Sequence, residues 1–436
     1  MEHFSVPQSH CNEAAPRGNS PDGEKIAEMR SAKPNSLGLY FSIPFCRSKC
    51  TYCNFASGVY PASEHGRYVH RLLADLADAS KWAERMQVEL PRRVDTIYFG
   101  GGTPSLLEPE LFTRIFAAIR TQFRVDKTAE ITIECAPGQL SDGVLEAMAA
   151  AGVNRVSLGV QSFVDREAAQ SGRLHTRGMV LEDLRRLREA GIANLNVDLL
   201  AGLTGQTLDS WRESLAVLLD SGVPHASVYM LEIDEDSRLG RELLSGGARY
   251  GAELVPNDDS IARMYEEAVA IFASAGLKQY EISNFAQKDM ESRHNLRYWQ
   301  RKPYLGLGLD ASSMLRSPDR DDTLVLRATA TSDLAEYLDG GASPETAWLG
   351  PTQQLEEAWF LGLRRNAGVS FADLASEFGD EACEPSFEAA RRLAGDGLLE
   401  LRRNKHGETA RLTARGRLIS NDVFQEFLGL APVLTR

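Results

Sequence analysis

The stretch SIPFCRSKCTYCNF, residues 42–55, carries three of the chain's six cysteines, Cys46, Cys50 and Cys53, within eight positions. A tight cysteine cluster in a long chain indicates a metal or catalytic site rather than a disulfide framework. Structural zinc sites and most iron–sulfur clusters take four protein ligands, and no second Cys or His pair with suitable spacing stands nearby. Three thiolates therefore predict an iron–sulfur cluster with one iron open to a small molecule. Zinc with the distant Cys135 as fourth ligand is the alternative.

The composition indicates a large, acidic globular protein. The 436 residues are 43% hydrophobic, which allows a large core and more than one domain. No window approaches the roughly 18 apolar residues of a membrane span, and the start lacks the pattern of a secretory signal. We therefore expect a cytoplasmic location. The net charge of −13 argues against general binding to nucleic acid.

From residue 37 to 285, short β-type runs alternate with amphipathic helical stretches, which is typical of βα units around a parallel sheet. About six such units in about 250 residues favour an α/β fold with a partial (β/α)6 TIM-like barrel over a flat doubly wound sheet. The predicted strands are 38–43, 94–100, 130–135, 155–160, 195–200 and 226–231, with a further candidate at 279–283. The predicted helices include 65–86, 109–123, 178–191 and 259–276.

In such a barrel, functional groups gather where the strands end. The cysteine loop follows the first predicted strand, and the glycine turn 100–103 follows the second. Glu134, Gln161 and Asp198 end the third, fourth and fifth. These residues are therefore expected to meet at one mouth of the barrel.

Three further segments flank the barrel. Residues 1–36 are rich in Pro, Ser, Asn and charge, and we expect a mobile extension there. Residues 286–350 are expected to form a connecting segment that contains the sequence HNLRYW. Residues 351–436 predict three helices, two strands around a polar turn and a final helix at 416–429, which is a winged-helix-like α+β domain.

The sequence allows two roles for that domain. It could bind nucleic acid, or it could cover the mouth of the barrel. The acidity of the whole chain favours the cover. The basic residues on which nucleic-acid binding would depend are Arg402, Arg403, Lys405 and Arg411.

The spacing C-x3-C-x2-C after the first strand of a barrel is the signature of the radical S-adenosylmethionine superfamily. Within it, the chain resembles the family of oxygen-independent coproporphyrinogen III dehydrogenase and its heme-chaperone branch. The resemblance covers about residues 37–430 and rests on YFSIPFCRSKCTYCNF, YFGGGTPS, GVQSF, NVDLLAGLTGQT, YEISNFA, HNLRYW and YLGLGLDASS in this order. It implies that Cys46, Cys50 and Cys53 hold a 4Fe-4S cluster whose open iron binds S-adenosylmethionine.

The resemblance also implies the residues that contact S-adenosylmethionine. A glycine turn suits this role because a missing Cβ lets the ligand approach the backbone closely. A salt bridge between Arg173 and Asp198 at the barrel rim is the structural alternative for those two. The implied contacts are Tyr40, Tyr52, Gly101, Gly102, Thr103, Glu134, Gln161, Arg173 and Asp198.

Two features favour the chaperone branch. The dehydrogenase has a further cysteine two residues after the third, whereas this chain has Phe55. The chaperone branch has the HNxxYW pattern, which implies that His294 ligates heme iron and that Tyr298 and Trp299 contact the porphyrin. Alternatively, His294 begins a helix and the aromatic pair anchors it in the core. Relatives often carry a histidine near Ala311 that this chain lacks.

We therefore predict a heme chaperone that binds a 4Fe-4S cluster, S-adenosylmethionine and heme and delivers heme to an apo-hemoprotein. The recipient is expected to be respiratory, and any contact with a membrane would come through it. The resemblance also implies a homodimer, and no nucleic acid is expected as a partner. The alternative function is that of the dehydrogenase, the radical oxidative decarboxylation of coproporphyrinogen III to protoporphyrinogen IX. A third alternative is a winged-helix regulator that uses its iron–sulfur cluster as a sensor.

Overall fold

The structure is a computed structural model that describes residues 36–318, 324–340, 343–405 and 407–430. The extension expected at 1–36 lies outside the described residues except for Ser36, and so does Cys11. Among the described helices, none is both long and apolar enough to cross a bilayer.

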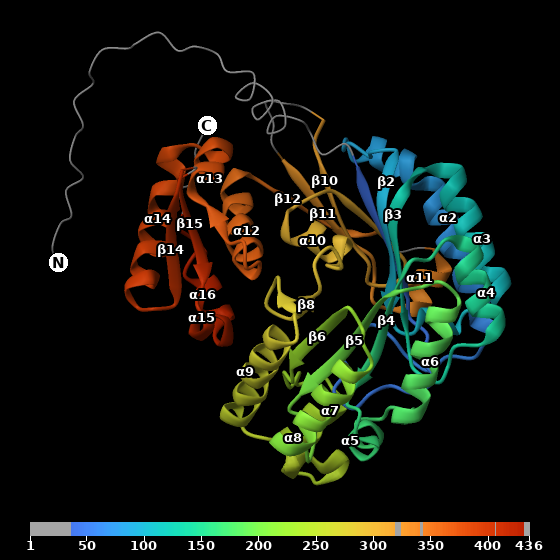
Figure 1. The fold of residues 1–436 in the computed structure, drawn as a ribbon. Helices are drawn as coiled ribbons and strands as arrows, with labels where there is room; N and C mark the ends of the chain where they lie inside the picture. Colours follow the sequence, from blue (N-terminus) through green and yellow to red (C-terminus); the bar gives the residue numbers. More distant parts are fainter. Residues whose placement is uncertain (1–35, 319–323, 341–342, 406, 431–436) are drawn as a thin grey trace, which may run out of the picture. The chain divides into compact units, whose positions relative to one another are not determined.

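One twelve-stranded sheet forms the larger part of the described chain (Figure 1). Its central strands lie in sequence order and each is parallel to the next. Each overlaps one of the predicted strands, so the α/β partial barrel is confirmed. The central strands are β1 (Leu37–Ile43), β2 (Arg93–Gly101), β3 (Arg124–Cys135), β4 (Arg155–Gln161), β5 (Asn194–Ala201) and β6 (His225–Met230).

Helices between these strands pack on one face of the sheet (Figure 1). In α2 (Ser63–Arg85), the buried residues Tyr68, Leu72, Leu76 and Ala79 recur at helical spacing, so one face of the helix enters the core. The other helices between the strands are α3 (Pro109–Gln122), α4 (Asp142–Ala151), α5 (Asp165–Gln170), α6 (Arg177–Glu189) and α7 (Leu208–Asp220). Two more, α8 (Arg238–Leu244) and α9 (Asp258–Ser274), follow β6.

The sheet continues beyond the barrel strands on both sides. The segment 286–350, expected as a connection, contributes β9 (Tyr304–Leu307), which pairs in parallel with β1. The strands β10 (Ser312–Arg316), β11 (Val325–Thr329) and β12 (Glu345–Leu349) follow in antiparallel order. At the other edge are β8 (Asn284–Ala286) and β7 (Lys278–Gln279), so the candidate strand 279–283 is reduced to a short edge strand.

The C-terminal unit has its own core and a three-stranded sheet in the order β13-β15-β14. The ring of Trp359 stacks on Phe427 with centroids 4.3 Å apart, and Phe371 stacks on Phe387 at the same distance. The predicted three helices and wing are present, while the predicted final helix is two short ones. The elements are α12 (Pro351–Arg364), β13 (Val369–Ser370), α13 (Phe371–Phe378), α14 (Asp380–Gly395), β14 (Leu399–Asn404), β15 (Gly407–Leu412), α15 (Ala414–Leu418) and α16 (Ser420–Gln425).

Candidate functional site

The cysteine loop after β1 is closed by hydrogen bonds within itself. The backbone N–H of Cys46 donates to the carbonyl oxygen of Gly58 at 2.9 Å. The Nζ atom of Lys49 donates to the carbonyl oxygens of Phe55 and Ser57 at 3.0 and 2.9 Å. The lysine thus ties the two ends of the cysteine stretch together.

The loop is also fixed from outside by the segment that follows α5. Ser48 donates its hydroxyl to the carbonyl oxygen of Gly172 at 2.9 Å, and the backbone N–H of Thr51 donates to Ser171 at 3.0 Å. These bonds hold the cysteine loop against the segment after α5, although the two are distant in sequence.

All three clustered cysteines are free thiols, with Cys50 buried and Cys46 and Cys53 half-buried. Burial raises the pKa of the Cys46 thiol, and hydrogen bonds with Thr103 and Ser57 oppose that rise. A bound metal would reverse the effect of burial because it binds the thiolate.

The zinc alternative needs Cys135 as a fourth ligand beside the three clustered cysteines. Among the described residues, no three His, Cys, Asp or Glu side chains lie close enough to hold a single metal ion. Cys135 lines the same cavity as the cluster cysteines, but its thiol is buried and burial raises its pKa to about 12. A bound metal would have to overcome this effect of burial, as it would at Cys46.

The glycine turn at the end of β2 lies directly against the cysteine loop. The backbone N–H of Gly102 donates to Ile43 at 2.8 Å, and that of Thr103 donates to Phe45 at 2.7 Å. A Cβ atom on Gly102 would lie 2.8 Å from the carbonyl oxygen of Phe45. Gly102 is therefore required by packing within the chain, whereas sequence reasoning considered only the approach of a ligand.

A cavity of about 310 Å³ lies between the cysteine loop and the ends of the barrel strands. Residues from the ends of the six central strands and from the loops that follow them meet here, as expected for this fold. The predicted residues that line it are Cys46, Cys50, Cys53, Tyr52, Gly101, Gly102, Thr103, Glu134, Gln161, Arg173 and Asp198.

Tyr40 is the one predicted S-adenosylmethionine contact outside this lining. Its ring lies 6.1 Å from that of Tyr98, centroid to centroid, in a stacked arrangement. Burial and the nearby charge of Glu134 raise the pKa of Tyr40. Tyr40 thus lies next to Tyr98, close enough to Glu134 to feel its charge.

Two partly shielded carboxylates, Glu134 and Asp198, form an acidic wall of the cavity. Glu134 accepts a hydrogen bond of 2.8 Å from the Tyr98 hydroxyl, and burial raises the pKa of Glu134 to about 7. Asp198 accepts hydrogen bonds from Ser157 at 3.0 Å and Asn196 at 2.7 Å, and burial raises its pKa as well. All these donors are uncharged, so a cationic ligand would be stabilised here.

Arg173 faces the cluster cysteines instead of Asp198. Its Nη1 atom lies 3.5 Å from the Sγ atom of Cys50, and its Nη2 atom donates to the carbonyl oxygen of Gly159. The rim salt bridge considered from the sequence is thus replaced by a contact with the cysteine loop. Gln161 beside it has a φ of 68°, an unusual conformation for a residue with a side chain.

These residues fit a 4Fe-4S cluster with bound S-adenosylmethionine. Three free thiols converge on the cavity with an arginine beside one of them. Glu134 and Asp198 suit the amino group and the sulfonium of S-adenosylmethionine because opposite charges attract. The glycine turn lines the same cavity.

Sequence reasoning missed several residues of this cavity. Tyr229 at the end of β6 and Leu174 line it while remaining 42% and 56% exposed. Gln139 also lines it, and its buried Oε1 atom has no partner within the described residues. The position of Tyr229 at a strand end was the available signal.

The HNLRYW segment forms α10 (Arg293–Trp299), and His294 is completely buried there. Its Nδ1 atom lies 2.9 Å from Thr96 Oγ1, and its Nε2 atom lies 2.8 Å from the Tyr298 hydroxyl. Both ring nitrogens are thus engaged by the protein. Burial and Arg297 lower the pKa of His294 to about 3.

The two aromatic residues of the motif are packed as well. The Tyr298 ring meets Tyr304 edge to face at 4.6 Å, and the Arg364 guanidinium lies 4.5 Å from the Trp299 ring centroid. In this conformation, the motif anchors α10, which is the alternative weighed from the sequence.

The basic residues of the wing are partly neutralised. Arg402 and Arg411 both pair with Glu400, at 2.7 and 2.8 Å. Such pairing leaves less positive charge for phosphate groups.

Comparison with known protein families gives two matches. Residues 40–218 match the radical SAM superfamily, and residues 349–419 match the HemN C-terminal domain. The first segment contains the cysteine loop and the whole predicted S-adenosylmethionine site.

Several characterised proteins are similar over most of the chain. The heme chaperone HemW of Lactococcus lactis is 32% identical over 91% of this chain and 98% of that protein. The heme chaperone HemW of Bacillus subtilis is 33% identical over 89% of this chain and 98% of that protein. The solved structure of coproporphyrinogen III oxidase (HemN) from Escherichia coli has the same fold, with a TM-score of 0.75, 20% identity and 93% coverage of each chain.

Proposed function

The chain belongs to the family of the heme chaperone HemW within the radical S-adenosylmethionine superfamily, and we propose that it binds heme and delivers it to an apo-hemoprotein. The match to HemW proteins over nearly their whole length supports this proposal. We expect the recipient to be a respiratory hemoprotein, and we expect this chain to form a homodimer.

In this proposal, Cys46, Cys50 and Cys53 hold the 4Fe-4S cluster, and the cavity beside them holds S-adenosylmethionine. When bound, this pair supplies one-electron chemistry. Glu134 and Asp198 orient the cationic methionine end, the glycine turn presents backbone groups to it, and Tyr52 shields the cysteines. Tyr40, Gln161 and Arg173 complete the implied set of contacts.

The side chain of Phe55 favours the chaperone over the dehydrogenase. This residue replaces the fourth cysteine of the dehydrogenase loop, and it is 64% exposed at the edge of the cavity. A phenyl ring cannot ligate iron or transfer a proton. It offers instead an apolar surface at the mouth, which suits a flat hydrophobic ligand or a protein partner.

The heme contacts implied by the HNLRYW motif remain predictions, and they require a change of conformation. The residues concerned are His294, Tyr298 and Trp299. For His294 to ligate heme iron, its hydrogen bonds with Thr96 and Tyr298 would have to break and α10 would have to move. Such a rearrangement would belong to the heme-bound state.

An anaerobic turnover assay separates the two functions. The cluster-loaded protein is incubated with a reductant, S-adenosylmethionine and coproporphyrinogen III, and the porphyrins are analysed by chromatography. We expect no protoporphyrinogen IX from the wild type or from Phe55→Cys. Formation of protoporphyrinogen IX by the wild type would establish the dehydrogenase and overturn the chaperone proposal.

A further inference from the structure

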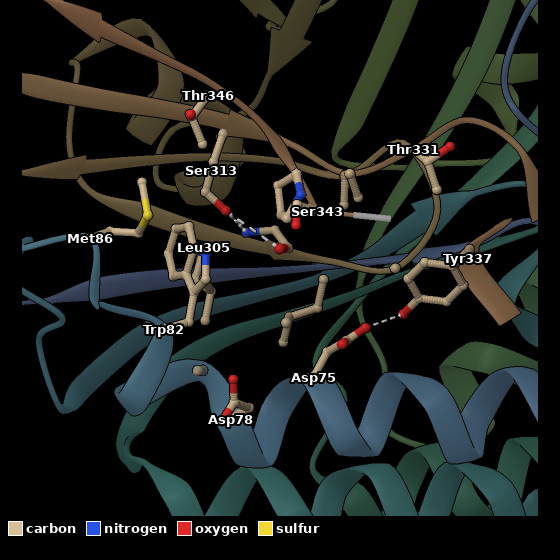
Figure 2. Close-up of a pocket in the computed structure, with 18 of the residues that line it drawn as sticks. Asp75, Asp78, Trp82, Met86, Leu305, Ser313, Thr331, Tyr337, Ser343 and Thr346 are labelled. Atoms are coloured by element: carbon tan, nitrogen blue, oxygen red, sulfur yellow. Dashed lines mark hydrogen bonds between the residues drawn. The ribbon is translucent and has the colours of Figure 1, made fainter. Parts of the chain in front are cut away.

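A second cavity, of about 450 Å³, lies between α2 and the added strands β9 to β12 (Figure 2). Its charged side chains pair with their neighbours. Tyr337 donates its hydroxyl to Asp75 at 2.7 Å, which Figure 2 shows as a dashed line, and Arg85 pairs with Asp78 at 2.8 Å. Opposite charges thus cancel in this lining, and it does not define the charge of a ligand.

The interior of the barrel, in contrast, holds a buried polar chain that ends at the S-adenosylmethionine cavity. In β5, Asn196 and Asp198 are two residues apart, so both lie on the same face of the strand, and Asp198 lines that cavity. His225, the first residue of β6, is paired in register with Asn196. His225 and Asn196 are both buried, so their polar atoms must find partners within the protein.

The side-chain amide of Asn196 presents its nitrogen to Asp198. An ionised carboxylate can only accept hydrogen bonds, and the Nδ2 atom of Asn196 lies 2.7 Å from Oδ1 of Asp198. The same nitrogen donates to the Oγ atom of Ser157 at 2.7 Å, and Ser157 donates in turn to Oδ2 of Asp198 at 3.0 Å. Both carboxylate oxygens of Asp198 therefore depend on the orientation of one amide group.

The carbonyl oxygen of that amide depends on His225. Its Oδ1 atom lies 2.6 Å from the Nδ1 atom of His225. Ser227 lies 3.3 Å from the same oxygen, but the single hydroxyl proton of a serine can serve only one short bond, and Asn284 accepts it at 2.8 Å. His225 is therefore the close donor to Asn196, and its proton must be on Nδ1.

The surroundings of the imidazole support this tautomer. Burial and the positive charge of Arg155 lower the pKa of His225 well below its ordinary value, so the ring is neutral and carries one N–H group. The Nε2 atom then accepts from the Tyr280 hydroxyl at 2.9 Å. That hydroxyl accepts from the backbone N–H of Ser292, which precedes α10, at 3.2 Å. Every donor between Ser292 and Asp198 thus points toward the cavity.

We propose that His225 is a positioning residue for S-adenosylmethionine, because it holds the Asn196 amide with its N–H groups toward Asp198. The inference rests on the S-adenosylmethionine site of the proposed function and adds a residue outside the lining of that site. Without the donor on His225, Asn196 can turn its carbonyl oxygen toward Asp198, and the two oxygens repel each other.

This orientation matters because Asp198 is shielded from water. Burial raises the pKa of Asp198, and the hydrogen bonds with Asn196 and Ser157 oppose that rise. Hydrogen bonds to a carboxylate favour its charged form. Loss of the donor from Asn196 therefore weakens the negative charge that attracts a cationic ligand.

Two substitutions of His225 separate its donor from its bulk. In His225→Asn, the amide nitrogen is the same number of bonds from Cα as Nδ1, so it can still donate to Asn196. In His225→Gln, the amide nitrogen is one bond farther out, in the place of Nε2, and the donor to Asn196 is lost. Glutamine fills more of the buried space than asparagine, so a purely structural role of His225 predicts that His225→Gln is the milder change.

Equilibrium dialysis of the cluster-loaded proteins measures their affinity for S-adenosylmethionine, and unfolding curves confirm that the variants are folded. We expect about tenfold weaker binding in His225→Gln and a change of at most about threefold in His225→Asn. Equal affinities in the two variants, or weaker binding by His225→Asn, would overturn the role of His225 and leave the proposed function standing. Absence of S-adenosylmethionine binding by the wild type would overturn the ligand site and this inference together.

Nitrogen-15 NMR of the full-length, cluster-loaded protein with labelled histidine reads the tautomer directly. The signals of His225 are identified by their absence from either variant. We expect a neutral ring that is protonated on Nδ1. A ring protonated on Nε2, or on both nitrogens, would overturn the inference.

Discussion

The guanidinium of Arg173 lies with its Nη1 atom 3.5 Å from the Sγ atom of Cys50. A cation at this distance stabilises the more negative, reduced form of a cluster bound to that sulfur. We expect Arg173→Met to shift the cluster reduction potential to more negative values. An EPR-monitored redox titration measures the shift, with Arg185→Gln on the surface of α6 as control. An unchanged reduction potential in Arg173→Met would show that the charge of Arg173 does not act on the cluster.

Replacement of each cluster cysteine separates the cluster from the zinc alternative. We expect Cys46→Ala, Cys50→Ala and Cys53→Ala to lose iron and sulfide after anaerobic reconstitution, because only three protein ligands are present. Cys135→Ala should keep both, since the proposed cluster uses only the three clustered cysteines. Loss of metal in Cys135→Ala, with zinc in the wild type, would favour zinc instead.

Glu134 makes S-adenosylmethionine binding dependent on pH. Because burial raises its pKa to about 7, Glu134 is protonated at pH 6 and becomes a carboxylate as the pH rises above 7. The carboxylate attracts a cationic ligand, so we expect the affinity to increase from pH 6 to pH 8. Equilibrium dialysis at a series of pH values measures this.

The variant Glu134→Gln is the control for that dependence. It should bind S-adenosylmethionine more weakly at pH 8 and show a flat profile. A wild-type profile as flat as that of the variant would remove Glu134 from the binding site.

The close packing of Gly102 on the cysteine loop predicts a specific defect. In Gly102→Ala, the added Cβ would lie 2.8 Å from the carbonyl oxygen of Phe45, so the loop must shift. We expect lower cluster occupancy after reconstitution. Gly66→Ala in α2 is the matched control because nothing lies within 4 Å of the added Cβ. Full occupancy in both variants would contradict this role.

His294 is expected to act on stability in the heme-free protein. His294→Ala leaves the hydroxyls of Thr96 and Tyr298 without this partner, which costs about 1–3 kcal/mol in the free energy of unfolding. Denaturant unfolding measures the loss. Hemin titration of the folded variant then tests the predicted heme role: a changed Soret spectrum would support His294 as the iron ligand, and an unchanged one would remove it.

Acid should destabilise the protein through the same residue. The pKa of His294 is about 3 in the folded state, below its ordinary value of 6.5, so the unfolded chain binds the proton more readily. The stability that depends on neutral His294 is present above pH 6.5 and is lost as the pH falls toward 3. His294→Ala should lack this part of the acid dependence, which unfolding curves at several pH values would reveal.

The barrel could be predicted because strands buried on both faces form continuous apolar runs such as YFSI and VSLGV. Strand ends then indicated where Glu134, Gln161 and Asp198 would meet, and the structure places all three in one cavity. The C-terminal helices were predictable from their regular apolar spacing.

The added strands could not be predicted in the same way. The strand β9 is short and depends on pairing with β1, which is far away in the sequence. The cavity beside α2 exists only because these strands extend the sheet, so its lining carries no local signal. The hydrogen bond of His294 with Thr96 likewise joins α10 to β2, which is distant in sequence.

Titration of the cluster-loaded wild-type protein with hemin under anaerobic conditions, with the Soret band recorded, tests whether this protein binds heme. We expect a shifted Soret maximum that saturates at one heme per chain. A band that rises without saturation and keeps the spectrum of hemin in buffer would contradict it.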